Sequence, residues 1–241
     1  MTDDDPTWRP WTRRIAHGFG RHGDVGHVRP RRARREHRDH PCGARRRHQL
    51  LDTGDFYGMG HNEMLIGEAL STRNRDEAVI SVKFGAQRGP DGAWLGYDAR
   101  PAAVKTAVAY SLQRLRTDHI DVYRPARLDQ QVPIEETIGA IAEMVQAGYV
   151  RYIGLSEVGS DTIRRAAAVH PICDLQIEYS LISRGIERGI LDTCRESGIA
   201  ITAYGVLSRG LISGHWSPER SLVQTDFRNR SPRFQGENLT R

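Results

Sequence analysis

The 241 residues are 38% hydrophobic and 27% charged, which is the composition of an ordinary globular protein. No apolar run is long enough to cross a membrane, and the start of the chain lacks the apolar stretch of an export signal, so we expect a cytoplasmic protein without a membrane partner. The net charge of +5 is local: residues 1–49 hold 13 Arg against 6 acidic residues, whereas the remainder holds 22 basic against 24 acidic residues. The body of the chain is nearly neutral, which disfavours nucleic acid as its partner.

Residues 1–49 form an Arg-rich segment that differs from the rest of the chain. Between residues 16 and 49, large apolar residues are too sparse for any helical or strand period. Three interpretations compete: a basic arm that binds nucleic acid, a solvated tail, and the translation of a shifted reading frame. We favour the third, because Arg, Gly, Ala, His and Pro dominate the shifted frames of GC-rich coding DNA. The transcript sequence upstream of codon 50 tests this hypothesis.

The three cysteines, Cys42, Cys173 and Cys194, are scattered and odd in number. Their spacing fits neither a disulfide framework nor a metal site, so we expect no bound metal. We expect Cys173 and Cys194 to be buried thiols.

Regular structure is predicted from residue 50 onward. Leu50 and Leu51 enter a short strand, which is followed by Asp52 and, in the next loop, by Tyr57. A helix is predicted to follow, with one face marked by Met64, Leu65, Gly67 and Leu70. Taken alone, an Asp and a Tyr at this spacing are more often a turn residue and a core aromatic than a site.

Strands and helices then alternate along the chain. Five further strands are expected over residues 78–83, 120–123, 152–156, 175–177 and 200–204. Four further helices are expected over residues 104–115, 133–148, 161–169 and 186–196. This order predicts a parallel sheet, and the absence of a Gly-rich phosphate loop favours a (β/α)8 TIM barrel over a doubly wound sheet. Only about six of the eight β/α units are recognisable within residues 50–241, so the predicted barrel is incomplete.

Polar residues follow the predicted strands at their carboxyl ends, where a barrel keeps its catalytic groups. Asp52, Tyr57 and Lys83 have a chemical use if they meet there. A phenol is a poor acid at neutral pH, but an adjacent ammonium stabilises its anion, and a carboxylate holds the ammonium in place. The phenol then serves as a proton donor to a carbonyl oxygen. A lysine that simply reaches solvent at a strand end is the commoner case for Lys83 alone.

Several motifs in order resemble those of the aldo-keto reductase superfamily. They are Leu51-Asp52-Thr53-Gly54-Asp55-Phe56-Tyr57-Gly58 with Asn62-Glu63, Val79-Ile80-Ser81-Val82-Lys83, Ile153-Gly154-Leu155-Ser156-Glu157, Gln176-Ile177-Glu178-Tyr179-Ser180 and Ala203-Tyr204-Gly205-Val206-Leu207-Ser208-Arg209-Gly210. The resemblance implies a (β/α)8 barrel that reduces an aldehyde or ketone with NADPH, and it leaves NADH open.

The same resemblance implies roles for individual residues. Asp52, Tyr57 and Lys83 match three of the family's four catalytic positions. The residues that match cofactor-binding positions are Ser156 and Gln176 at the nicotinamide carboxamide, Tyr204 against the nicotinamide ring, and Ser208, Arg209, Gly210 and Leu211 over the pyrophosphate.

Three departures from the family pattern predict an impaired or inactive chain. Ala126 stands where the family usually has His, so Arg127 or His61 would have to contact the substrate carbonyl. The family's opening segment is replaced by the Arg-rich segment, and the chain stops before the family's eighth strand. An NADPH-binding sensor barrel with little turnover is therefore the alternative function. The carbonyl substrate and the oligomeric state are left open.

Overall fold

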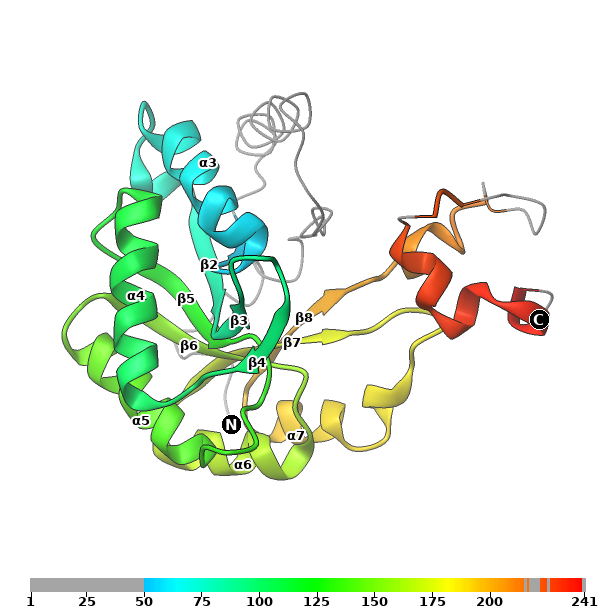
Figure 1. The fold of residues 1–241 in the computed structure, drawn as a ribbon. Coiled ribbons are helices and arrows are strands. Elements are labelled where there is room, and N and C mark those ends of the chain that lie inside the picture. Colours follow the sequence, from blue (N-terminus) through cyan, green and yellow to red (C-terminus); the bar gives the residue numbers. More distant parts are fainter. Residues whose placement is uncertain (1–49, 215, 217–221, 225, 240–241) are drawn as a thin grey trace.

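The computed structural model describes residues 50–214, 216, 222–224 and 226–239, so the interpretations of residues 1–49 and of Cys42 lie outside the described part. A curled sheet of six parallel strands forms its centre (Figure 1), in the order β1-β2-β5-β6-β7-β8. Each strand pairs in parallel with its neighbour. The strands are β1 (Leu50–Gly54), β2 (Val79–Phe84), β5 (Ile120–Pro125), β6 (Val150–Ser156), β7 (Ile172–Glu178) and β8 (Ala200–Tyr204).

Helices cover the convex side of this sheet (Figure 1). The α-helices are α3 (His61–Leu70), α4 (Pro101–Leu115), α5 (Ile134–Gln146), α6 (Ser160–Val169) and α7 (Ile190–Glu196). Short 3-10 helices are η1 (Tyr57–Gly60), η2 (Arg75–Glu77), η3 (Gly185–Glu187), η4 (Ser208–Gly210), η5 (Phe227–Arg230), η6 (Pro232–Phe234) and η7 (Gly236–Leu239). The arrangement is an incomplete (β/α)8 barrel, as predicted. No helix in the described part of the chain has both the length and the apolar character needed to cross a membrane.

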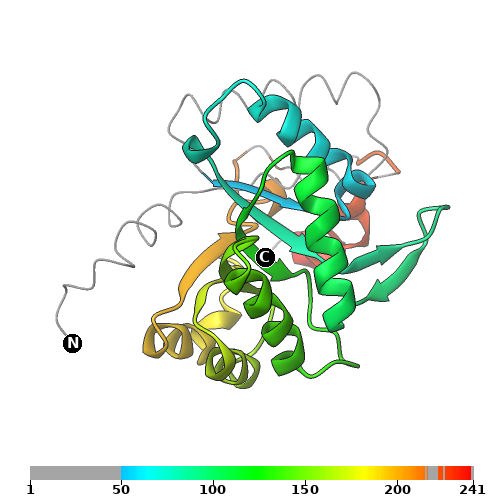
Figure 2. The same cartoon turned by 90° about the vertical axis from the view of Figure 1, so that its left-hand side faces the viewer.

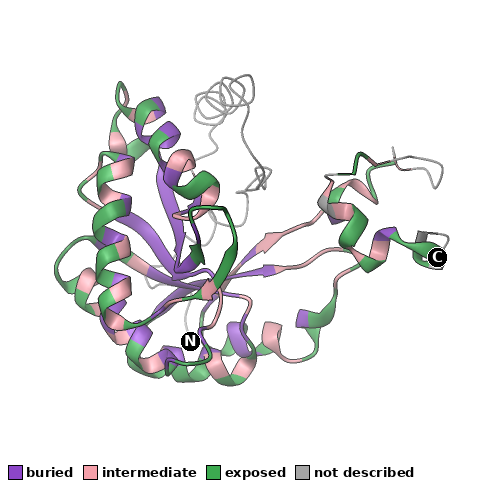
Figure 3. Cartoon of the chain, viewed as in Figure 1, coloured by how far each residue is buried: buried purple, intermediate pink, exposed green. Residues whose placement is uncertain are grey.

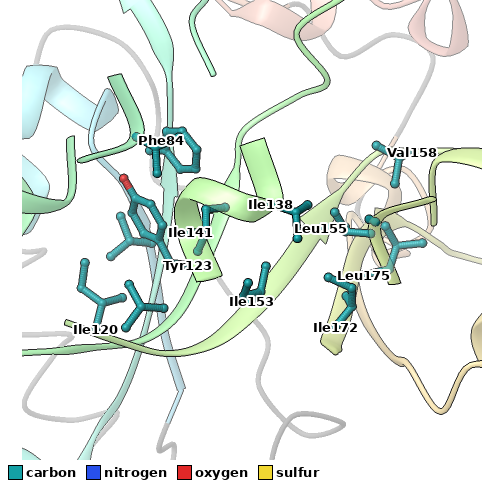
Figure 4. Packing of buried hydrophobic residues seen from close by; sticks show 14 of the residues in the cluster. Phe84, Ile120, Tyr123, Ile138, Ile141, Ile153, Leu155, Val158, Ile172 and Leu175 are labelled. Atoms are coloured by element: carbon teal, nitrogen blue, oxygen red, sulfur yellow. The ribbon is translucent and has the colours of Figure 1, made fainter. Parts of the chain in front are cut away.

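The main core lies between the helices and the convex face of the sheet (Figures 3 and 4). Its strand residues Ile80, Ile153 and Leu175 have no exposed surface. The β-branched run of β2 is buried along its whole length, as a parallel strand covered on both faces requires. From the helical side, Ile138 and Ile141 of α5 complete the packing.

The predicted inward face of the first helix is wrong at one position. Met64 is 52% exposed, whereas Glu63 is fully buried and pairs with Arg114 of α4 at 2.5 Å. The close contact with α4 explains this orientation, because a Cβ on Gly67 would lie 2.7 Å from the Arg114 carbonyl oxygen. The helix therefore turns its glycine, rather than its methionine, toward the neighbouring helix.

Two further elements differ from the prediction. An antiparallel hairpin of β3 (Ala86–Arg88) and β4 (Trp94–Tyr97) follows β2 and projects from the body (Figure 2). The helix expected over residues 186–196 is divided into η3 and α7 at Gly189, whose φ of 109° is left-handed. Cys173 and Cys194 are buried free thiols, as expected.

Strands β1 and β8 are the edges of the sheet, and each pairs with a single neighbour among the described residues. Beyond β8, the described part of the tail returns to the sheet. Arg233 pairs with Glu178 at the end of β7 at 2.8 Å, and Phe234 packs edge-on against Trp216.

Candidate active site

The carboxyl ends of β1 and β2 hold a buried ion pair. Lys83 Nζ lies 2.5 Å from Asp52 Oδ2, and the two side chains are only 5% and 7% exposed. The register places Asp52 opposite Ser81 and Gly54 opposite Lys83, so that the pair forms diagonally across adjacent strands. This geometry holds the ammonium in a fixed position at the rim of the sheet.

The other oxygen of Asp52 accepts two more hydrogen bonds. Ser81 Oγ donates to Asp52 Oδ1 at 3.1 Å, and Gln176 Nε2 of β7 donates to the same atom at 2.9 Å. Burial alone would raise the pKa of Asp52, but the charges of Lys83 and Arg124, together with the hydrogen bonds from Lys83 and Gln176, hold this pKa below its ordinary value. Asp52 is thus a carboxylate at neutral pH.

Tyr57 lies beside this pair. Lys83 Nζ is 5.0 Å from the centroid of the Tyr57 ring, and Phe56 packs edge-on against the same ring at 4.7 Å. The chain turns sharply after Tyr57, because Gly58, Met59 and Gly60 all have positive φ. The structure therefore brings Asp52, Tyr57 and Lys83 together at one end of the sheet, which is the arrangement that the sequence predicts for them.

A second buried ion pair lies next to the first one, and the sequence did not predict it. Arg124 Nη2 of β5 lies 3.0 Å from Asp174 Oδ1 of β7, and both side chains are 1% exposed. The same nitrogen donates to Ser81 Oγ at 3.0 Å. The signal in the sequence is weak, because Arg124 and Asp174 share their mostly apolar strands with a second charged residue, Asp121 in β5 and Glu178 in β7.

The residues that resemble a nicotinamide site lie at the ends of β6, β7 and β8. Ser156 is buried opposite Gln176, and its hydroxyl accepts a hydrogen bond from Arg127 Nη1 at 3.3 Å. The Gln176 amide oxygen makes no hydrogen bond within the described residues, although its nitrogen binds Asp52. Burial, and then a hydrogen bond to Glu157, raises the pKa of Tyr204, so its phenol keeps its proton.

The loop from Ser208 to Leu211 follows β8 and is compact. Ser208, Arg209 and Gly210 all have positive φ, and Ser208 Oγ lies 3.2 Å from Ser180 Oγ. Arg228 Nη1 donates to the Arg209 carbonyl oxygen at 3.3 Å. Amide, hydroxyl and guanidinium groups therefore surround one rim, a donor set that suits a nucleotide with a carboxamide and phosphates.

The fourth expected position offers no polar side chain. Ala126 is 3% exposed, and its backbone N–H donates to the Phe84 carbonyl oxygen at 2.8 Å. Arg127 reaches Ser156, whereas His61 begins α3 and its side chain makes no hydrogen bond within the described residues. Of the two proposed substitutes, Arg127 is therefore the one that contacts an expected site residue.

The comparisons with known proteins identify the family. The model of the aldo/keto reductase family matches residues 42–236. The chain belongs to the aldo-keto reductase family. Aldo-keto reductase yakc [NADP(+)] of Schizosaccharomyces pombe is 41% identical over 192 residues, which are 78% of this chain and 56% of that protein. Probable aldo-keto reductase 1 of Glycine max is 44% identical over 192 residues, 79% of this chain and 54% of that protein. The chain thus spans little more than half of these aldo-keto reductases.

Solved aldo-keto reductase structures share the fold. The glycerol dehydrogenase of Gluconobacter oxydans superposes with a TM-score of 0.80 and 28% identity over 89% of this chain and 66% of its own. An aldo/keto reductase from Klebsiella pneumoniae, solved with NADP and acetate, has a TM-score of 0.69 and 26% identity over 80% of this chain and 64% of its own.

Proposed function

We propose that this protein reduces an aldehyde or ketone with NADPH, and that Tyr57 is the proton donor. The observation that supports this most directly is the buried Asp52–Lys83 pair beside the Tyr57 ring. A buried lysine held by a carboxylate places a fixed positive charge next to a phenol. That charge favours loss of the phenol proton to a carbonyl oxygen that gains negative charge.

Each residue of the cluster has a separate task in this proposal. Tyr57 holds the proton that the product alcohol needs, and Lys83 stabilises the phenolate that remains. Asp52 keeps Lys83 charged and in position. NADPH, when bound, supplies the hydride. Ser156 and Gln176 would hold its carboxamide, Tyr204 would lie against its ring, and Ser208, Arg209, Gly210 and Leu211 would contact its phosphates.

NADPH is proposed over NADH for two reasons. One relative is named for NADP(+), and a structural neighbour was solved with NADP. In this chain, the guanidinium of Arg228, which pairs with Asp226, lies against the Arg209 backbone after β8, where a phosphate-rich ligand would need a cation. The proposed substrate class is a small carbonyl compound, and the proposed reductase unit comprises residues 50–241.

The buried Ala126 supports slow turnover. No side-chain donor is available at position 126 to polarise the carbonyl, and losing one such donor typically costs 10²–10³-fold in turnover. The second candidate function, an NADPH-binding sensor with little turnover, rests on this same observation.

The purified chain tests both functions. NADPH oxidation is measured in the presence of 4-nitrobenzaldehyde, and cofactor binding is measured as the quenching of protein fluorescence. We expect carbonyl-dependent oxidation that is lost in Tyr57→Phe and kept in Tyr110→Phe, which changes an exposed tyrosine on α4. Quenching without NADPH oxidation would support the sensor function. The absence of both quenching and oxidation would overturn both functions.

A further inference from the structure

The Arg124 side chain spans three strands of the sheet. It starts on β5, passes over β6 at Gly154, and ends at Asp174 on β7. A Cβ at Gly154 would lie 2.9 Å from Arg124 Nε and 2.5 Å from Asp174 Oδ1. Glycine is therefore required beneath the guanidinium, because any larger side chain would displace the ion pair.

Both oxygens of Asp174 are engaged. Oδ1 accepts from Arg124 and, at 3.5 Å, from the Cys173 thiol, while Oδ2 accepts from Thr202 Oγ1 of β8 at 2.5 Å. Asp174 faces Gly154 because β7 carries one extra residue, Cys173, at a bulge between Ile172 and Asp174. The carboxylate is thus held in one orientation and presents a fixed acceptor to Arg124.

Ser81 connects this pair to Asp52. An arginine side chain has donors and no acceptor, so the Ser81 hydroxyl must accept from Arg124 Nη2 with a lone pair. Its single proton is then directed to Asp52 Oδ1 at 3.1 Å. Arg124 therefore determines which way the serine hydroxyl points, and the hydroxyl in turn determines the position of the Asp52 oxygen.

Stability alone explains this buried arginine poorly. Its Nε and Nη1 have no hydrogen-bond partner among the described residues. A buried ion pair whose remaining donors are unsatisfied contributes little to folding, because desolvation offsets the attraction. The value of the arginine must then lie in what it does to its neighbours.

We propose that Arg124 is a positioning residue for the Asp52–Lys83 pair, acting through the Ser81 hydroxyl. The proposal rests on the proposed reductase function and assigns a further residue to it. Asp52 faces Ser81 and Lys83 from β2, Arg124 from β5 and Gln176 from β7. Arg124 is thus the second positive charge near Asp52, and it favours the ionised form of that carboxyl group.

The test removes the second pair without leaving a buried charge unpaired. Arg124→Gln/Asp174→Asn is compared with wild type for the pH dependence of kcat/KM. The matched control is Arg75→Gln/Asp121→Asn, which removes a 2.6 Å pair at the opposite end of the strands. We expect the acidic limb of the profile to move up by about one pH unit in the first variant only, because Arg124, and not Asp174, is among the charges that lower the pKa of Asp52. A folded first variant with the wild-type profile would overturn the proposal.

A second measurement does not depend on turnover. The acid midpoint of unfolding is determined for wild type and for Arg124→Gln/Asp174→Asn, each with and without Asp52→Asn. We expect the double variant to raise this midpoint when Asp52 is present and to leave it unchanged when Asp52 is replaced. An equal shift in both backgrounds would show that Arg124 is purely structural. If the wild-type protein reduces no carbonyl compound but the shift in the acid midpoint still depends on Asp52, the proposed reductase function fails, whereas the proposed coupling between Arg124 and Asp52 holds.

Discussion

The ammonium of Lys83 lies 5.0 Å from the centre of the Tyr57 ring, although the two residues come from different β/α units. The contact depends on the loop after β1, which folds back over the end of β2. Asp55 secures that fold, because its backbone N–H donates to the Lys83 carbonyl oxygen at 2.9 Å and its side chain accepts from the Gly85 N–H at 3.2 Å.

Replacing Lys83 should affect stability and turnover separately. Lys83→Met leaves the Asp52 carboxylate buried without its partner, which should destabilise the fold by about 3–5 kcal/mol. Lys83→Met/Asp52→Leu should recover much of that stability, as measured by unfolding in denaturant. The same variant should not recover carbonyl reduction. Lys105→Met removes an exposed ammonium that pairs with Glu143, and it should change neither quantity. Reduction by the recovered double variant would show that the ammonium is dispensable.

Gly67 should not tolerate a side chain. A Cβ at this position would meet the Arg114 carbonyl oxygen at 2.7 Å and Leu115 backbone atoms at 2.9 Å. Gly67→Ala should therefore cost about 1–3 kcal/mol, because backbone atoms of α4 must move. Gly139→Ala in α5 has no atom within 4 Å and should stabilise the protein by up to about 1 kcal/mol. Equal effects of the two changes in urea unfolding would contradict the close contact between α3 and α4.

Asp55 should make stability fall with rising pH. Burial raises the pKa of Asp55 from its ordinary value to about 7. A group whose folded pKa is raised stabilises the fold at low pH, and this contribution is lost as the pH rises from about 4 toward about 7. Asp55→Asn should therefore flatten the dependence of Tm on pH between these values. Asp161→Asn changes an exposed carboxylate and should leave the dependence as it is in wild type.

Restoring a donor at position 126 should raise turnover. Ala126→His places an imidazole where the chain has none, and the gain in kcat should reach about 10²-fold if the ring contacts the carbonyl oxygen. Ala126 is 3% exposed, so the larger side chain should also lower Tm. Ala126→Leu adds similar bulk without a donor and should lower Tm with no gain. A folded His variant no faster than the Leu variant would argue against a missing donor.

The sequence predicts the alternation of elements well because burial on both faces leaves clear apolar runs, such as that of Val79 to Val82. It does not reveal the hairpin of β3 and β4, because Trp94, Leu95 and Tyr97 are exposed and their pattern is not that of a buried strand. It also assigns Met64 rather than Glu63 to the buried face, because the partner that neutralises Glu63 is on another helix.

For the site, the sequence predicts that Asp52, Tyr57 and Lys83 meet, because strand ends converge in a barrel. Their catalytic roles stay predictions. The ion pair between Arg124 and Asp174 could not be predicted from the sequence, because it depends on the bulge at Cys173 and on which residue of β6 lies between the two charges.

The passage of Arg124 over Gly154 also bears on how the strands find their alignment. Sliding β6 by two residues in either direction would put Tyr152 or Ser156 beneath the guanidinium, and neither leaves room for it. Only one alignment of β5, β6 and β7 lets Arg124 and Asp174 form their ion pair. Any other register would bury the two charges unpaired, which costs desolvation free energy. Because Gly154 has no side chain, it favours one strand register over the alternatives, much as a single polar residue determines the register of a coiled coil.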